Sequence, residues 1–280
     1  AQTIRVTDAT QETIKFLRGI TWADVYHPST WEKVLVLCQV EPQDDVLPAR
    51  ADLRARRKAG DKLSHRIAVA EIASAQEPMW WTLADCINSS LQTGKPPRIL
   101  RALRFSPVGA RSLQPVSIRG GPTIDPNRED FFRAVVDARD TLGRADPKLA
   151  DALKIVANAT SYGIWAEVNI EDGERPIMAY ATEKRQAVIP PGEKPGRYYM
   201  PPLAAFITSG ARLLLSLLEH EVALCGGVSA FCDTDSLAII SSKEGGELTY
   251  RDHERKLQTI RVLTWAQVDE ALLALERLNP

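Results

Sequence analysis

Two aspartates one residue apart stand between two largely apolar runs in the last quarter of the chain. Asp233 and Asp235 belong to the segment Asp233-Thr234-Asp235-Ser236, flanked by residues 228–232 and 237–240. Such flanks favour strands, so the segment predicts a hairpin whose tip holds both carboxylates. Side chains alternate across a strand, which predicts that Asp233 and Asp235 point to the same side.

Carboxylates this close repel each other, so they raise each other's pKa or take a cation between them. A hard, oxygen-seeking ion such as Mg²⁺ fits such a pair, and the spacing predicts a metal site for phosphoryl chemistry. The alternative is a polar β-turn, because Asp, Thr and Ser are ordinary turn residues.

A lysine and an asparagine one helical turn apart form a second candidate. Asp146-Pro147 predicts a helix that runs toward Tyr162 and stops at Gly163. Its expected buried stripe consists of Leu149, Leu153, Val156 and Thr160. At 100° per residue, Lys154 and Asn158 fall roughly 140° to 180° from Leu149, on the face that the core does not use. The alternative is a solvated helix face.

The helix before it has the same kind of start signal. Asp125-Pro126 predicts a helix that continues to Leu142 and ends at Gly143. Its apolar stripe consists of Phe131, Val135, Ala138 and Leu142. The connection between the two helices is short, so they are predicted to lie antiparallel as a hairpin.

Composition is that of a soluble globular protein. The chain has 280 residues, 44% of them hydrophobic and 25% charged, which suits one large domain or two rather than a disordered protein. The net charge of -1 gives no overall basic footprint for nucleic acid. No apolar run is expected to reach the roughly 20 residues of a membrane span, and a cytoplasmic location is expected. The four scattered cysteines are interpreted as buried thiols.

The remaining segments alternate strand and helix patterns. Strands are expected at 4–6, 34–40 and 116–124, and helices at 8–17, 82–91, 98–103, 203–224 and 268–278, the last capped by Thr264. A β-hairpin is expected to join 164–170 to 177–180, followed by a loop at 190–202.

Three of these segments together resemble the family B DNA polymerases. Lys154-Ile-Val-Ala-Asn158-Ala-Thr-Ser-Tyr162-Gly163 resembles their lysine, asparagine and Tyr-Gly signature. Phe231-Cys-Asp233-Thr-Asp235-Ser resembles their aromatic-X-Asp-Thr-Asp-Ser motif, and Ile207-Thr-Ser-Gly-Ala-Arg212 resembles the helix that links the two. The match covers roughly residues 127 to 245, in the family's order.

The resemblance implies a role for each of these residues. Asp235 would be the principal metal ligand and Asp233 a supporting one, for two Mg²⁺ ions that Mn²⁺ can replace. Lys154 would meet the triphosphate of the incoming dNTP, with Asn158 positioning the nucleotide and Tyr162 close to the nascent base pair. Arg139, on the preceding helix, would also reach the triphosphate.

The chain departs from the family pattern at several places. Tyr162 stands eight residues after the lysine rather than seven, which turns it by about 100° unless a one-residue bulge intervenes. Ala159 replaces the usual serine. The family's upstream Asp-X-X-Ser-Leu-Tyr-Pro-Ser motif is not found, and Asp24-Val-Tyr26-His-Pro28-Ser29 is interpreted as a loop before a capped helix. The chain is therefore expected to be a fragment without that motif and without the thumb.

The resemblance implies an α+β fold, with an antiparallel polymerase palm sheet backed by helices and a helical-hairpin fingers element. Residues 1–125 are assigned to a mixed segment of unassigned role, 126–163 to the fingers and 164–280 to the palm. The expected activity is template-directed nucleotidyl transfer, with primer-template DNA and dNTPs as partners and no membrane. A catalytically inactive module that binds nucleic acid and an Asp-X-Asp glycosyltransferase are the alternatives. The oligomeric state is not predicted.

Overall fold

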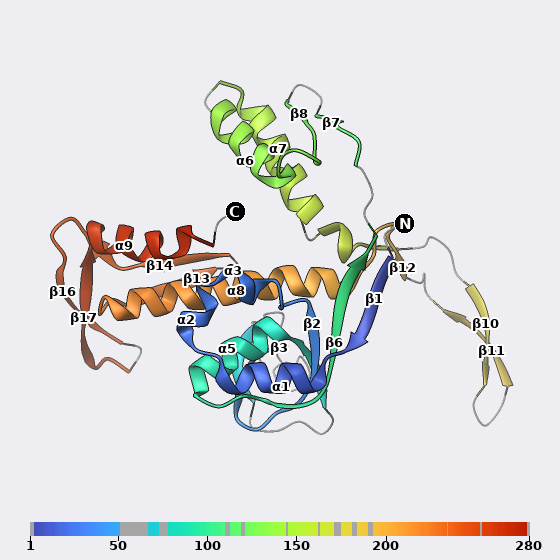
Figure 1. Cartoon of the computed structure of the whole chain (residues 1–280), viewed down its shortest axis with the longest axis horizontal. Helices are drawn as coiled ribbons and strands as arrows, with labels where there is room; N and C mark the ends of the chain where they lie inside the picture. Colours follow the sequence, from blue (N-terminus) through green and yellow to red (C-terminus); the bar gives the residue numbers. More distant parts are fainter. Residues whose placement is uncertain are drawn as a thin grey trace. The chain divides into compact units, whose positions relative to one another are not determined.

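The computed structural model describes most of the chain and divides it into two compact units (Figure 1). Unit 1 is Gly109–Ile207, and unit 2 combines Thr3–Val108 with Thr208–Pro280. Unit 2 is thus built from two stretches separated in sequence by unit 1. The described residues are 3–50, 67–72, 78–109, 113–118, 121–143, 145–161, 163–170, 175–180, 184–189, 193–233, 235–252 and 254–278.

A four-stranded antiparallel sheet organises the first half of unit 2. Its order is β1-β6-β2-β5, with β1 at Thr3–Asp8, β6 at Arg98–Val108, β2 at Val36–Glu41 and β5 at Met79–Thr82. Alternate residues of β2 are fully buried, because one face of the sheet supports the core. A separate antiparallel hairpin joins β3 (Asp45–Arg50) to β4 (Ile67–Ile72).

Helices cover the core side of this sheet. They are α1 (Thr10–Gly19), the short α2 (Trp22–Val25) and α3 (Pro28–Trp31), and α5 (Leu83–Thr93). Helix α5 packs against β2, β3 and β5, and α1 packs against β6 and α5. Thr82 caps α5 by accepting a hydrogen bond from the Asp85 amide at 3.2 Å, as its start signal predicts.

The second stretch of unit 2 completes this core and carries the acidic hairpin. Its elements are α8 (Pro201–Leu224, which begins in unit 1), β13 (Ser229–Asp233), β14 (Ser236–Ile239), β15 (Ser241–Ser242), β16 (Gly246–Arg251), β17 (Leu257–Thr264) and α9 (Trp265–Glu276). Leu213 and Leu217 of α8 join the buried cluster formed by the sheet, α1 and α5. Thr264 and Gln267 form the predicted capping box of α9.

Unit 1 contains the helical hairpin and small two-stranded sheets. It comprises β7 (Val116–Ser117), β8 (Thr123–Ile124), α6 (Phe131–Leu142), α7 (Pro147–Ser161), the 3₁₀ turn η1 (Gly163–Trp165), β9 (Val168–Ile170), β10 (Arg175–Tyr180), β11 (Lys184–Ile189) and β12 (Glu193–Pro195). Helices α6 and α7 lie side by side (Figure 1). All four residues of the predicted α6 stripe belong to the cluster between them.

Helices and antiparallel sheets together confirm the α+β class. Among the described strands, β15 and β17 form a short parallel pair, and the other pairs are antiparallel. The expected division has three consecutive segments, 1–125, 126–163 and 164–280. In the structure, unit 2 instead combines residues from both ends of the chain.

Two local predictions that concern strands are wrong. Residues 98–103 begin strand β6 rather than a helix, because they pair with β2 on one side and β1 lies on the other side of the strand. The expected hairpin of 164–170 with 177–180 does not form. Instead, β9 pairs with β12 and β10 pairs with β11, so that part of the expected loop at 190–202 is a strand.

Helix α8 overturns the expectation that no apolar run reaches the length of a membrane span. It has 24 residues, and an 18-residue window within it has a mean hydropathy of 1.4, which suffices for a span by length and composition. Arg212 is the one charged residue of the helix between Pro201 and Leu218. Leu213 and Leu217 are fully buried in the core of unit 2, whereas only 28% of the apolar window as a whole is buried.

The cysteines differ in exposure, so their interpretation as buried thiols holds for two of the four. Cys38 and Cys86 are buried, Cys225 is half-buried and Cys232 is exposed on β13. The hydrogen bond with Cys38 raises the pKa of the Cys86 thiol, and burial raises it further. These two thiols are core side chains of unit 2.

Candidate functional site

The predicted acidic hairpin is present in unit 2. Strands β13 and β14 are antiparallel, and Asp233 at the end of β13 pairs with Ser236 at the start of β14. Asp235 therefore lies in the connecting turn, where it is exposed. Thr234 and the side chain of Asp233 lie outside the described residues, so the prediction that both carboxylates point to one side stays a prediction.

The donor chemistry at this turn suits a hard cation. Asp235 offers an exposed carboxylate, and the Asp233 backbone is two residues away in the same hairpin. Among the side chains that the structure describes, no three His, Cys, Asp or Glu lie together as a metal group, and Asp233 is not one of those side chains. Carboxylate oxygens of this kind are ligands that Mg²⁺ accepts together with water.

Two glycines allow the chain to pass from α8 into the hairpin. Gly226 has φ of +78°, and its amide donates to Ala223 while the Gly227 amide donates to Val222, both at 2.9 Å. A Cβ on Gly227 would lie 2.6 Å from the side chain of buried Leu263 on β17. The hairpin thus begins where the backbone packs directly against the core of unit 2.

A buried ion pair fixes α8 against α5. Arg212 donates from Nε to Asp85 Oδ1 at 3.0 Å and from Nη2 to Asp85 Oδ2 at 3.1 Å, a bidentate arrangement. The side chain of Asp85 is 5% exposed, and Thr82 Oγ1 donates to its Oδ2 at 2.9 Å. Asp85 therefore serves both the cap of α5 and the arginine of the linking helix.

The same seam continues one turn along both helices. Ser216 Oγ donates to Asn88 Oδ1 at 2.6 Å, and Gln92 Nε2 donates to Asn88 Oδ1 at 3.1 Å and to Ser216 Oγ at 3.2 Å. We call Asp85, Asn88, Gln92, Arg212 and Ser216 the polar seam. The sequence indicated Arg212 but not its partners, although the Thr82-X-X-Asp85 capping spacing was a signal for Asp85.

Helix α7 of unit 1 presents the predicted Lys154 and Asn158 to solvent. Asp146 caps the helix by accepting a hydrogen bond from the Leu149 amide at 3.1 Å. Leu153 is fully buried, and Leu149 and Ala157 pack around it, so the core stripe uses Ala157 where Val156 was expected. Both Lys154 and Asn158 are exposed, which confirms that they lie away from the core. Tyr162 lies outside the described residues.

Arg139 is on the exposed part of α6. Its side chain is 45% exposed, and its Nε lies 3.8 Å from Asp140 Oδ1, a surface ion pair at long distance. Such a pair contributes little to stability and leaves the guanidinium accessible. The structure therefore places Lys154, Asn158 and Arg139 in the helical hairpin of unit 1, and Asp233 and Asp235 in the hairpin of unit 2.

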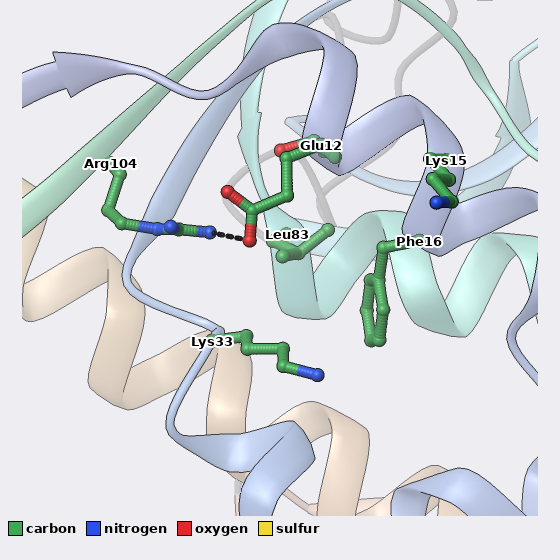
Figure 2. Close-up of a pocket in the computed structure, with 7 residues that line it drawn as sticks. Glu12, Lys15, Phe16, Lys33, Leu83 and Arg104 are labelled. Carbon is green, nitrogen blue, oxygen red and sulfur yellow. Dashed lines mark hydrogen bonds and ion pairs between the residues drawn. The ribbon is translucent and has the colours of Figure 1, made fainter.

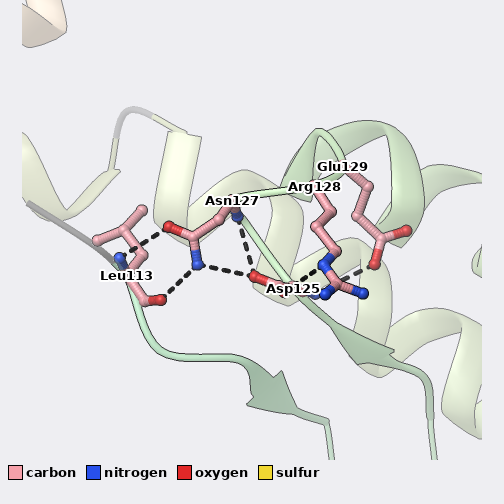
Figure 3. A network of polar contacts seen from close by, with 5 residues as sticks. All are labelled: Leu113, Asp125, Asn127, Arg128 and Glu129. Carbon is pink, nitrogen blue, oxygen red and sulfur yellow. Dashed lines mark hydrogen bonds and ion pairs between the residues drawn. The ribbon is translucent and has the colours of Figure 1, made fainter.

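The start of α6 differs from the prediction. The helix begins at Phe131, because Asp130 rather than Asp125 caps it by accepting from the Arg133 amide at 2.7 Å. Asp125 instead accepts from the amide and side chain of Asn127 at 3.1 and 2.8 Å (Figure 3). Asn127 also bonds both backbone groups of Leu113, so this turn ties the entry of α6 to the preceding segment.

Asp24 has a structural role. It lies in α2, where its carboxylate accepts hydrogen bonds from the Thr21 amide and hydroxyl at 2.8 and 2.6 Å. These bonds hold the pKa of Asp24 below its ordinary value. The segment forms the short helices α2 and α3 rather than the expected loop, because Thr21 and Asp24 complete a capping box.

Comparison of the chain with protein families, with curated proteins and with solved structures finds no match.

Proposed function

We propose that this chain is the fingers-and-palm portion of a family B-like DNA polymerase that transfers nucleotides from dNTPs to a primer 3′-hydroxyl. The observation that carries the proposal is the sequence order of three elements. A helix with a solvent-facing lysine and asparagine comes first, then a long helix anchored through its arginine, then a hairpin with aspartates at its tip. In the proposal, α6 and α7 are the fingers and the β13–β14 hairpin belongs to the palm.

Lys154 suits the role of a triphosphate contact. An ammonium group on the exposed face of α7 stays solvated and does not disturb the core, because Leu149 and Leu153 occupy the buried face. A positive charge at the triphosphate offsets the negative charge that develops on the phosphoryl oxygens during transfer. Asn158, one turn later, would orient the same nucleotide by hydrogen bonding, and Arg139 would add a second cation from α6.

Asp235 and Asp233 are the residues that would hold Mg²⁺. When bound, the two ions would activate the primer hydroxyl and stabilise the leaving pyrophosphate. The protein's own contribution is a turn that exposes the Asp235 carboxylate to water, a short distance along the chain from the end of α8. Arg212 is a positioning residue in this scheme, since it acts through α8.

Primer extension tests the proposal directly. The full-length gene product is assayed on a primer-template with Mg²⁺ or Mn²⁺, as wild type and as Asp235→Asn. Loss of a group that stabilises charge in the transition state is expected to lower the extension rate by at least about 100-fold. Asp269→Asn, which removes an exposed carboxylate on α9, is the matched control and should extend at the wild-type rate.

Two further outcomes separate the parts of the proposal. Lys154→Ala is expected to raise the dNTP concentration needed for half-maximal extension, while the affinity for duplex DNA is retained. Lys148→Ala on the same helix should leave both quantities unchanged. Extension by Asp235→Asn at the wild-type rate would contradict the proposal.

A second candidate is a polymerase-derived module that binds nucleic acid without catalysis. It is favoured by the lack, within these 280 residues, of an Asp-X-X-Ser-Leu-Tyr-Pro-Ser motif that would add a third carboxylate. Salt-dependent DNA binding by wild type with no extension under any metal condition would support this candidate over the first.

A further inference from the structure

A cavity in unit 2, apart from the acidic hairpin, combines cationic and apolar walls. It has a volume of about 260 Å³ and lies between α1, α5, β6 and the segment after α3 (Figure 2). Its lining residues are Glu12, Thr13, Lys15, Phe16, Lys33, Leu83 and Arg104. These residues come from four separate parts of the first 104 residues, so no local motif in the sequence indicated the cavity.

Positive charge predominates at this cavity. Lys15, Lys33 and Arg104 line the cavity together with one carboxylate, Glu12, which accepts a hydrogen bond from Arg104 Nη2 at 2.8 Å. That bond holds the pKa of Glu12 below its ordinary value, so Glu12 is ionised at neutral pH and neutralises one of the three cations. The cavity keeps an excess of two positive charges, which favours a dianion.

A buried hydroxyl lacks a partner at the same place. Thr13 lines the cavity and is 2% exposed, and its Oγ1 forms no hydrogen bond within the described part of the chain. Leaving a buried hydroxyl unpaired is costly, and such a group in a native structure requires an explanation. The Oγ1 atom is itself covered by protein atoms, so a bound molecule with acceptor oxygens would become its partner once the Thr13 side chain rotates toward the cavity.

The remaining wall is apolar. Phe16 and Leu83 line the cavity, and Lys33 Nζ lies 5.1 Å from the centre of the Phe16 ring. In Figure 2 the Arg104–Glu12 pair is on one side of the cavity and Phe16 with Lys15 on the other. A ligand that spans it would place an anionic group among the cations and an apolar body against Phe16.

We propose that this cavity binds a small organic phosphate, with the phosphate beside Lys33 and Arg104 and an aromatic or apolar body against Phe16 and Leu83. A phosphate monoester carries close to two negative charges and three acceptor oxygens, which matches the excess charge and the unpaired Thr13 hydroxyl. The proposal is independent of polymerase activity, because every residue in it lies far from the acidic hairpin in sequence and none is assigned to nucleotide transfer.

Calorimetric titration with three probes tests the ligand class. Phenyl phosphate carries both groups, inorganic phosphate carries the anion alone, and benzyl alcohol carries the apolar body alone. Phenyl phosphate is expected to bind at least about 10-fold more tightly than either partial probe, since it uses both walls. Equal affinity for inorganic phosphate would overturn the role of the apolar wall, and no binding of phenyl phosphate at millimolar concentration would overturn the proposal.

Charge variants locate the binding. Lys33→Met keeps the apolar stem and is expected to weaken phenyl phosphate binding about 5- to 10-fold, as loss of one partly screened cation predicts. Lys243→Met, an exposed lysine of unit 2 outside the cavity, should bind like wild type. Equal weakening by both variants would indicate non-specific charge attraction and contradict a site at this cavity.

Thr13→Val separates a ligand contact from a packing defect. Removing an unpaired buried hydroxyl is expected to raise Tm of the unliganded protein by about 2–4 °C. If the hydroxyl contacts the phosphate, the same variant binds phenyl phosphate several-fold more weakly than wild type, although it is the more stable protein. Unchanged affinity in a stabilised Thr13→Val protein would overturn the assigned contact.

Discussion

The two units contain cores of very different size. Among the described residues, the main cluster of unit 2 has 16 buried side chains from two sheets and four helices, whereas the cluster of unit 1 has three, of which two lie in the helical hairpin and one, Ile124, in β8. Local stability follows the amount of apolar surface buried, so α6 and α7 should open more readily than α5 and α8. The residues proposed to meet a nucleotide therefore lie on a weakly supported element, and those that position the acidic hairpin lie on a strongly supported one.

The largest expected effect comes from truncating matched core leucines. Leu213 of α8 and Leu153 of α7 are both fully buried, and each Leu→Ala change should cost about 2–5 kcal/mol in its own unit. Leu213→Ala should be nearer the upper value, because the larger cluster has less freedom to collapse around the cavity. Urea denaturation gives the free energy of unfolding, and amide hydrogen exchange identifies the unit affected.

Exchange protection decides whether the comparison holds. Leu153→Ala should remove protection in α6 and α7 and leave α5 and α8 protected. Loss of protection throughout the chain in this variant would contradict the view that the two cores are separate.

The next effect concerns the polar seam. Asp85→Asn leaves Arg212 without its carboxylate and should cost unit 2 about 1–3 kcal/mol, a value reduced because Arg212 is 30% exposed. The double variant Asp85→Asn with Arg212→Met should recover part of the loss, since the uncompensated charge is then removed. Thermal unfolding of both proteins measures the difference in stability. A double variant that is less stable than the single variant would contradict the explanation.

A smaller effect distinguishes function from stability in unit 1. Lys154→Ala and Lys148→Ala should each change the free energy of unfolding by less than about 0.5 kcal/mol, because both side chains are exposed on α7. Circular dichroism melts of both variants test this expectation. A marked loss of stability in Lys154→Ala alone would indicate that Lys154 has a structural partner.

The smallest effect is a pH dependence confined to unit 2. The hydrogen bonds from Thr21 lower the folded-state pKa of Asp24, so the ionised carboxylate stabilises the fold above its unfolded-state pKa. That contribution is lost as the pH falls below about 4 and the group takes up a proton. Asp24→Asn should reduce the decrease in unfolding free energy between about pH 5 and pH 3. An unchanged pH dependence in this variant would exclude Asp24 as a contributor.

Local signals in the sequence predicted the elements whose ends are fixed by nearby residues. Asp146 and Thr264 cap the helices that they were expected to cap, Thr82 lies at the expected start of α5, and the acidic hairpin forms between its apolar flanks. At α6, two aspartates five residues apart both fit a cap. Contacts with Asn127 and Leu113, which cannot be read from the pattern, hold Asp125 in a turn.

Non-local pairing explains the failures. Residues 98–103 were expected to form a helix, but the strand partners of β6 lie more than 50 residues away along the chain. In the strand, Arg98 pairs with Glu41 and Arg104 with Glu12. The cavity near Arg104 depends on the same distant pairing, and for that reason no local pattern in the chain predicts it.

The polar seam has a consequence for how far α8 can slide. Two helices joined by leucines alone have neighbouring packing positions of similar energy, one turn or about 5.4 Å apart. A one-turn slip of α8 would separate Arg212 from Asp85 and Ser216 from Asn88, and would leave buried polar groups unpaired. The seam therefore selects one axial position for α8. The hairpin that begins at Ser229, five residues after α8 ends at Leu224, takes its own position from that choice.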